Sequence, residues 1–354
     1  MTFERRYDID WLRVIAIWLL IIYHLVLCFQ PWASAFLGFI QNDKSVDQMM
    51  IPMSMLNIWR IPLLFYISGM GVCFTMRKRN WKQLLLERSR RILIPLLFGT
   101  ITIIPLGISI WQNYYRQKPD YVAHPGHLWF LGNIFLYVLI LFPLFYWLKK
   151  KQEGKLVTKI KKVFSTPWIL LLILFPFVIE TYLMKPQLFA LFAYTLHGFF
   201  FGFFAFLFGF LVVFSGSQFW KMIIKLRWGL LIIAAALFSI RYLYFDLNAP
   251  GMLIAVESNI WIFTMMSFGH KHLNKSNGAL TYLNKASYPI YILHMFFLFI
   301  GSYLIFPLDI PVSAKFIAVL LITFTGCYGT YEIVIRRVKP LRPLFGLNYK
   351  DKAN

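Results

Sequence analysis

Residues 11–30 of the chain read WLRVIAIWLLIIYHLVLCFQ, and apart from the aromatic residues the only polar side chains among them are Arg13, His24 and Gln30. An α-helix needs about 20 apolar residues to cross about 30 Å of hydrocarbon. The stretch therefore predicts a transmembrane helix that carries a cation and an imidazole at membrane depth.

Nine further apolar runs follow, of which the one at 166–180 is short. They lie at about 49–76, 92–110, 127–148, 166–180, 187–214, 228–245, 251–268, 286–306 and 314–335. We therefore predict an all-α, polytopic membrane bundle of about ten transmembrane helices in a single domain, 1–354. In this interpretation residues up to about 340 form the bundle, and 341–354 form a basic cytoplasmic tail.

The composition excludes other broad classes of protein. The 354 residues are 59% hydrophobic and 14% charged, whereas an ordinary soluble domain is about 25% charged. A nucleic-acid-binding protein would share the net charge of +22 but not this apolar content, so membrane lipids rather than nucleic acids are the expected partners. The three cysteines, Cys28, Cys73 and Cys327, lie in apolar runs without ligand spacing, and neither a disulfide framework nor a metal site is expected.

The basic residues are concentrated in alternate connections between the runs. Of the 36 Lys and Arg residues, 28 lie in 1–10, 77–91, 149–165, 215–227, 269–285 and 336–354. Cytoplasmic loops of membrane proteins carry such an excess. We therefore predict that both termini are cytoplasmic, which requires an even number of spans.

The first span carries its two ionisable residues on one face. Arg13 and His24 are eleven residues apart, which is about 16 Å of helix rise and about three turns. Histidine is the side chain best suited to move a proton near neutral pH. The alternative is an Arg13 that snorkels and a His24 that only packs.

Other charged residues lie inside later runs. Arg60 lies about halfway along its run, and Ser68 and Gly69 follow it, where they permit either close helix packing or ligand contact. Arg241 and Glu257 lie in neighbouring runs, and a pair between them would be an ordinary structural way to bury both charges.

Arg88 and Arg91 are three residues apart in a basic amphipathic stretch, which places them on one face of a helix. A guanidinium offers a rigid fork of donors that matches phosphate oxygens. The two residues are therefore candidates for binding a phosphorylated ligand. The alternative is attraction to anionic lipid headgroups.

Two later runs carry polar groups as well. His127 and Trp129 open one run, where they either face a polar acceptor or only mark the membrane interface. Ser287, Tyr291 and His294 are spaced by four and three residues, so they form one polar stripe on an otherwise apolar helix.

Five motifs follow one another along nearly the whole chain: DWLR at 10–13 with His24, FYISG at 65–69, Arg88-x-x-Arg91 before ILIP, HLWFL at 127–131, and SYPIYILH at 287–294. Together and in this order they resemble the acyltransferase 3 family of integral membrane acyltransferases, including members of the glucan biosynthesis protein C type. The resemblance implies a bundle of about ten helices in a bacterial inner or plasma membrane. It also implies transfer of an acyl group, usually acetyl and in the glucan type succinyl, from cytoplasmic acyl-CoA to a hydroxyl of an extracytoplasmic glycan or related acceptor.

This resemblance gives each candidate residue an expected role. His24 would be the general base or would carry the acyl group itself, and Arg60 or Tyr291 would stabilise the oxyanion. The candidate catalytic residues are His24, Arg13, Arg60, Tyr291 and His294. The candidate donor-binding residues are Arg88, Arg91, Ser68 and Gly69, and the candidate acceptor-binding residues are His127, Trp129 and Ser287.

A transporter or flippase for a lipid-linked glycan or an anionic metabolite is the alternative function, because Arg60, Arg241 and Glu257 would suit such a substrate. A membrane scaffold without catalysis is disfavoured, since inert spans rarely retain His and Arg at membrane depth.

Overall fold

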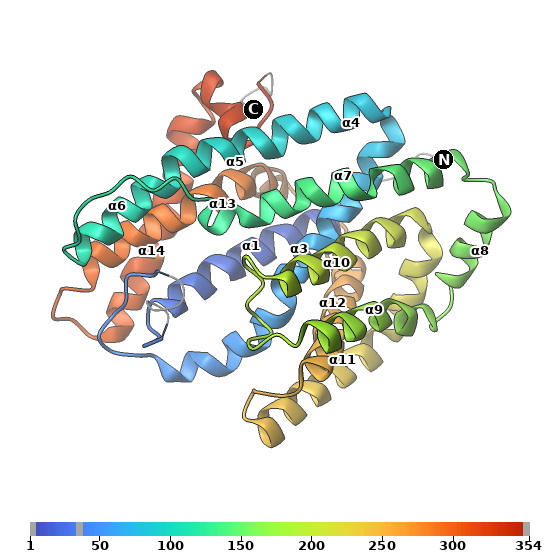
Figure 1. The fold of residues 1–354 in the computed structure, drawn as a ribbon, viewed down its shortest axis with the longest axis horizontal. Coiled ribbons are helices and arrows are strands. Elements are labelled where there is room, and N and C mark those ends of the chain that lie inside the picture. Colours follow the sequence, from blue (N-terminus) through green and yellow to red (C-terminus); the bar gives the residue numbers. More distant parts are fainter. Residues whose placement is uncertain (1–4, 33–37, 350–354) are drawn as a thin grey trace. The chain divides into compact units, whose positions relative to one another are not determined.

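The computed structural model describes residues 5–32 and 38–349, and every regular element within these ranges is a helix (Figure 1). The all-α prediction is therefore confirmed. The long helices are α1 (Tyr7–Leu27), α3 (Met50–Lys78), α7 (Trp129–Lys150), α9 (Ile169–Met184), α10 (Leu196–Phe214), α11 (Ser217–Phe245), α12 (Gly251–His272), α13 (Gly278–Ile305) and α14 (Val312–Thr330). The shorter ones are α4 (Trp81–Arg88), α5 (Ile94–Phe98), α6 (Ile104–Tyr114) and α8 (Lys155–Val163).

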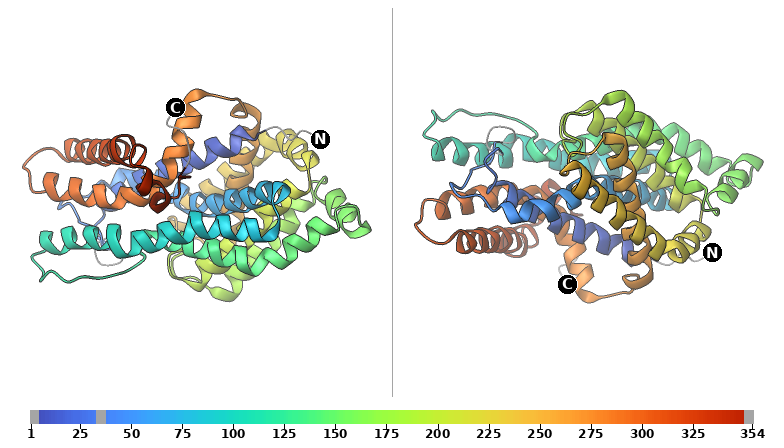
Figure 2. Two further views of the ribbon diagram at one scale, coloured as in Figure 1. Left: turned by 90° about the horizontal axis from the view of Figure 1, so that it is seen from above. Right: turned by 90° about the horizontal axis from the view of Figure 1, so that it is seen from below.

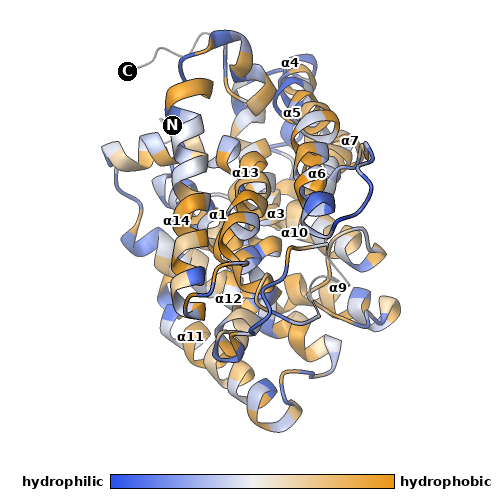
Figure 3. Ribbon diagram, turned by 90° about the vertical axis from the view of Figure 1, so that its left-hand side faces the viewer, coloured by the Kyte–Doolittle hydropathy of each residue, from blue (hydrophilic) through white to orange (hydrophobic). Residues whose placement is uncertain are grey.

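Nine helical segments in the described part of the chain are long and apolar enough to cross a membrane. Figure 3 shows hydrophobic residues along the helices and hydrophilic residues mostly in the connections. The chain is thus a multi-pass integral membrane protein, as predicted. One of the ten expected spans, the run at 166–180, corresponds to α9. This helix has 16 residues, so it extends only about 24 Å at 1.5 Å per residue.

The third span is longer than its apolar run, because the basic stretch before it is helical and continuous with it from Trp81 to Tyr114. Two π-helical turns, Ser89–Leu93 and Gly99–Ile103, interrupt the α-helical geometry. Each turn precedes a proline, Pro95 or Pro105, that has no N–H to donate and that crowds the carbonyl four residues earlier. The wider π turn accommodates both effects.

The described residues form two compact units. The first unit comprises Met1–Ala16, Ser54–Leu85 and Asn133–Leu280, and the second comprises Ile17–Met53, Leu86–Gly132 and Thr281–Asn354, within the described ranges. Helices α1, α3, α4, α7 and α13 contribute residues to both units. The prediction of a single domain remains a prediction, and each unit is described by itself.

In the first unit, α12 packs against α11 and α9, and α9 packs against α10 (Figure 1). Helices α3 and α10 approach until their backbones touch. A Cβ on Gly69 would lie 2.0 Å from the carbonyl oxygen of Phe206, and a Cβ on Gly209 would lie 2.0 Å from that of Tyr66. Only glycine fits at these two positions, so Gly69 has the packing role that was one of its two interpretations.

Arg241 and Glu257 form the ion pair predicted for them. Arg241 Nε donates to Glu257 Oε2 at 2.6 Å, and Nη2 donates to Oε1 at 3.0 Å. Nη2 also donates to the carbonyl oxygen of Ser54 at 3.2 Å. Both side chains are buried, with exposures of 2% and 0%, and the two-point contact compensates each charge with the other.

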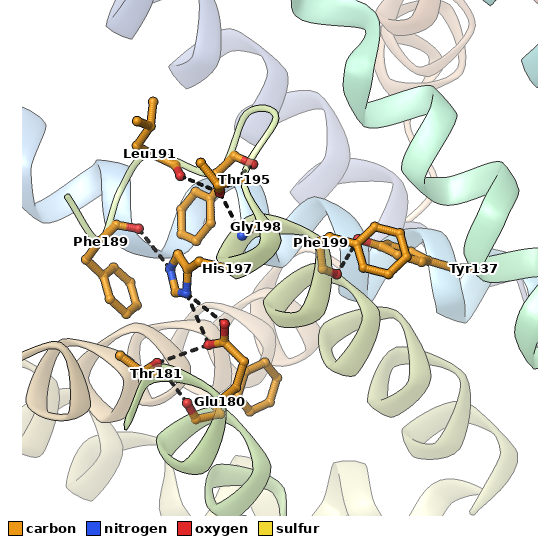
Figure 4. A network of polar contacts seen from close by, with 11 residues as sticks. Tyr137, Glu180, Thr181, Phe189, Leu191, Thr195, His197, Gly198 and Phe199 are labelled. Atoms are coloured by element: carbon orange, nitrogen blue, oxygen red, sulfur yellow. Dashed lines mark hydrogen bonds and ion pairs between the residues drawn. The ribbon is translucent and has the colours of Figure 1, made fainter. Parts of the chain in front are cut away.

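A second buried pair of the first unit joins α9 to the start of α10 (Figure 4). His197 Nδ1 lies 2.9 Å from Glu180 Oε1, and Nε2 lies 3.1 Å from the carbonyl oxygen of Phe189. Because a carbonyl only accepts, Nε2 carries a proton. The other ring nitrogen, Nδ1, therefore faces the carboxyl group of Glu180. The Thr195 hydroxyl accepts from Gly198 N at 2.9 Å and caps α10 beside it.

In the second unit, α13 and α14 lie side by side (Figures 1 and 2). A Cβ on Gly326 would lie 2.3 Å from the ring of Phe297, and a Cβ on Gly301 would lie 3.1 Å from Val319. The unit contains an apolar cluster that includes Leu25, Phe39, Leu298 and other buried residues.

The contact between α3 and α10 predicts the effect of adding one methyl group. Gly69→Ala should lower the free energy of unfolding by about 1–3 kcal/mol, because the new Cβ overlaps a backbone carbonyl that cannot rotate away. The measurement is unfolding of the purified protein in detergent. Gly71→Ala is the control, since nothing lies within 4 Å of its Cβ position, and equal losses in both variants would contradict the close contact.

The Arg241–Glu257 pair predicts a larger loss when one partner is removed. Arg241→Gln should destabilise the protein by about 3–5 kcal/mol, since it leaves a carboxylate buried without its cation. Arg336→Gln breaks the partly exposed pair with Glu332, 2.8 Å between Nη1 and Oε1, and should cost about 0–1 kcal/mol. A loss for Arg241→Gln no larger than for Arg336→Gln would show that the first pair is solvated.

Candidate active site

Two histidines from distant parts of the chain meet in the second unit. His24 Nδ1, on α1, lies 2.9 Å from His294 Nε2, on α13. The ring centroids are 5.1 Å apart and the ring planes are inclined by only 4°, so the contact is an in-plane hydrogen bond. His294 is fully buried and His24 is half-buried.

The neighbouring backbone determines the tautomers of both rings. His294 Nδ1 lies 2.7 Å from the carbonyl oxygen of Tyr291, which only accepts, so Nδ1 carries the proton. In the neutral ring Nε2 is then the acceptor, and His24 donates to it from Nδ1. We infer these positions from the hydrogen-bond network. They leave the lone pair of His24 on Nε2, the form that a general base requires.

The side chains of His127 and Tyr291 each bond to the backbone carbonyl of the other residue. His127 Nε2 donates to the carbonyl oxygen of Tyr291 at 3.0 Å, and the Tyr291 hydroxyl donates to the carbonyl oxygen of His127 at 2.5 Å. The His127 and His294 rings meet edge to face with centroids 4.7 Å apart. The Tyr291 hydroxyl proton is therefore engaged with backbone, and this residue acts here as a clamp between the two chain segments.

Apolar side chains surround the histidines. The Phe39 ring lies 5.6 Å from the His24 ring, and the Cys28 thiol donates to the His24 carbonyl at 3.4 Å. Such surroundings exclude water and strengthen hydrogen bonds between the polar groups inside. No group of three or more His, Cys, Asp or Glu side chains in the described ranges is arranged to hold a metal ion.

The remaining candidates of the second unit lie along the third span and α13. Arg88 ends α4, and Arg91 lies in the π turn that follows. A separation of three residues therefore does not place the two side chains on one face as it would in an α-helix. Arg91 Nε lies 3.3 Å from Glu87 Oε1. The Ser287 hydroxyl donates to the Leu283 carbonyl at 2.7 Å, and Trp129 packs edge to face on Phe130 with centroids 6.3 Å apart.

Four candidates belong to the first unit. Arg13 Nη1 lies 3.4 Å from Asp10 Oδ1. Arg60 is fully buried and donates from Nη2 to Asn57 Oδ1 at 3.5 Å. The Ser68 hydroxyl donates to the carbonyl of Leu64 at 2.8 Å, and Gly69 packs on α10.

The structure also reveals polar groups that the sequence analysis did not single out. Asp8 is fully buried in the first unit, where Arg6 donates to it at 2.5 and 2.8 Å and His270 Nδ1 lies 3.0 Å away. Glu180, the partner of His197, was missed too. The sequence could have indicated Glu180, since it is the only charged residue of the apolar helix α9.

One of three comparisons with known proteins finds a match. No significant match is found among curated proteins or among solved structures. A family model described as an acyltransferase domain matches residues 6–332. A match over most of the chain shows that the protein belongs to the acyltransferase 3 family and is a membrane-bound acyltransferase.

Proposed function

We propose that the protein transfers an acyl group from cytoplasmic acyl-CoA to a hydroxyl of an extracytoplasmic glycan or related acceptor. Acetyl is the favoured acyl group and succinyl the alternative. The bundle would lie in a bacterial inner or plasma membrane with both termini in the cytoplasm, which the distribution of Lys and Arg supports. The observation that carries the proposal is the hydrogen bond between His24 and His294.

His24 would act as the general base. Its Nε2 takes the proton of the acceptor hydroxyl while the hydroxyl oxygen attacks the thioester carbonyl carbon. The tetrahedral intermediate then collapses, the C–S bond breaks, and the protonated His24 returns its proton to the leaving thiolate of CoA. The products are the ester and CoA, and the enzyme ends in its starting form.

His294 would act as a positioning residue. When Nε2 of His24 is protonated, the Nδ1–H group becomes a stronger donor to His294 Nε2, so this bond stabilises the imidazolium that forms during the reaction. An acyl-histidine route uses the same lone pair of His24 as nucleophile. We favour direct transfer, because the bond to His294 supports a proton acceptor.

Donor and acceptor would reach His24 from residues of the same unit. Arg88 and Arg91 supply donors for CoA phosphates, and His127, Trp129 and Ser287 lie on the side of the acceptor in this proposal. Arg60, Arg13 and Ser68 belong to the first unit, and the roles expected of them stay predictions. The clamp geometry of Tyr291 favours a supporting role over donation to the oxyanion.

The transporter alternative loses its motivation. Two of the three buried charges on which it rested, Arg241 and Glu257, neutralise each other at 2.6 Å. They provide a structural pair rather than a binding site for an anionic cargo.

Replacing the base should abolish transfer. His24→Ala is expected to lower kcat by about 10²–10⁴-fold, measured with the purified protein, labelled acetyl-CoA and succinyl-CoA, and a glycan acceptor. His272→Ala, an exposed histidine at the end of α12, is the matched control and should keep full activity. Full activity of His24→Ala would refute the role of the base.

Replacing the positioning residue should separate kcat from KM. His294→Ala should lower kcat by about 10²-fold while KM for acyl-CoA stays unchanged, because the lost hydrogen bond orients His24 and does not bind the donor. His294→Gln should recover part of kcat, since its amide oxygen can accept from His24 Nδ1. Identical kcat values for the two variants would argue against the tautomer assignment.

A further inference from the structure

A buried hydroxyl lies between the basic stretch and the histidines without any hydrogen-bond partner. Tyr288, on α13, follows Ser287 and lies one helical turn before Tyr291. Its hydroxyl oxygen is buried and makes no hydrogen bond within the described residues. Buried hydroxyls are nearly always paired, so this one calls for a partner that the described residues do not supply.

The surroundings define the chemistry of that partner. The backbone of Arg91 lies at the same place, because the Cβ position of Gly346 is 3.3 Å from the Arg91 carbonyl oxygen and 2.2 Å from Cε1 of Tyr288, and Arg88 ends the helical turn just before it. Guanidinium groups only donate, so neither can accept the proton of the hydroxyl. The group that completes the arrangement must accept hydrogen bonds, and next to two cations a negatively charged oxygen is favoured.

The C-terminal strap, residues 338–349, covers this place. Its 3₁₀-helical part, Lys339–Phe345, packs beside α5 (Figure 1). Gly346 has a φ of +72°, and a Cβ there would lie 2.2 Å from Cε1 of Tyr288, so the strap backbone lies directly on the ring. Arg91 Nη2 donates to Asn348 Oδ1 at 3.2 Å.

The strap is anchored rather than loosely attached. The Phe345 ring packs edge to face on Phe98 with centroids 5.4 Å apart. Arg342 is buried, and its guanidinium donates to the carbonyl of Arg336. The expected basic tail is thus packed as far as Tyr349, and it lies beyond the residues 6–332 that the family model matches.

We propose that Tyr288, Arg88 and Arg91 form a subsite for a phosphate group of the acyl donor and that the strap closes this subsite from the cytoplasmic side. The inference rests on the proposed function. The Tyr288 hydroxyl donates to one phosphate oxygen, and the two guanidinium groups donate to others. Gly346 is required because any side chain at this position would separate the strap from the Tyr288 ring.

Binding of CoA to the purified full-length protein tests the subsite without any acceptor. Tyr288→Phe removes only the hydroxyl and should raise Kd for CoA by about tenfold or more, the loss expected for a hydrogen bond to a charged group. Binding of pantetheine, which has no phosphate, should stay unchanged. Tyr303→Phe, on the same helix, is the matched control and should bind CoA as the wild type does.

A second pair of variants tests the strap. Gly346→Ala should also raise Kd for CoA, because its Cβ would overlap the Tyr288 ring. Gly329→Ala is the control, since nothing lies within 4 Å of its Cβ position. An unchanged Kd for Gly346→Ala would remove the strap from the proposal.

The possible failures can be told apart. If the wild type binds CoA and Tyr288→Phe binds it equally well, the subsite is refuted while the proposed function stands. If the wild type binds no CoA or acyl-CoA, the proposed function fails as well. Vesicles of phosphatidylglycerol provide the remaining arm. Their anionic lipid is expected to stabilise the protein against unfolding if it fills the subsite. If Tyr288→Phe weakens this stabilisation but not the binding of CoA, the anion is a lipid headgroup and the proposal is overturned.

Discussion

Within the hydrocarbon of a membrane, a polar group has no water to bind, so it must find its partner inside the protein. The described structure meets this constraint in three ways. Arg241 and Glu257 compensate two full charges, and the imidazole of His197 bonds to the carboxyl group of Glu180 at 2.9 Å. The third case, His24 with His294, joins two groups that are both neutral.

The choice of a histidine to orient the base follows from the same constraint. In soluble hydrolases a carboxylate often fixes the tautomer of the catalytic histidine and stabilises the imidazolium. At membrane depth a permanent carboxylate is costly unless a cation is paired with it. A neutral imidazole avoids this cost, provided that its own tautomer is fixed. The carbonyl of Tyr291 fixes it by accepting from His294 Nδ1 at 2.7 Å, and the bond from His127 holds that carbonyl.

The helical fold was predictable because its signal is local. Apolar runs predict spans, and spacing predicts which residues share a helix face, as it did for Tyr291 and His294. The pair of Arg241 and Glu257 could be anticipated because their helices are consecutive. The bond between His24 and His294 could not, since the two residues are 270 positions apart and helical periodicity does not reveal which distant helix lies opposite. The role of Asp8 was missed because it depends on the packing around it.

In the basic stretch, a proline changes which residues share a face of the helix. Arg88 and Arg91 would share a face on an α-helix, but Pro95 cannot donate to the carbonyl of Arg91 and crowds it. The resulting π turn rotates the side chains away from α-helical register. It also leaves room beside the Arg91 carbonyl, which lies 3.3 Å from the Cβ position of Gly346. The proline therefore shapes both the presentation of the guanidinium groups and the surface on which the strap packs. A regular helix would retain the same basic residues but would lose this surface, so composition alone could not have predicted the covered site.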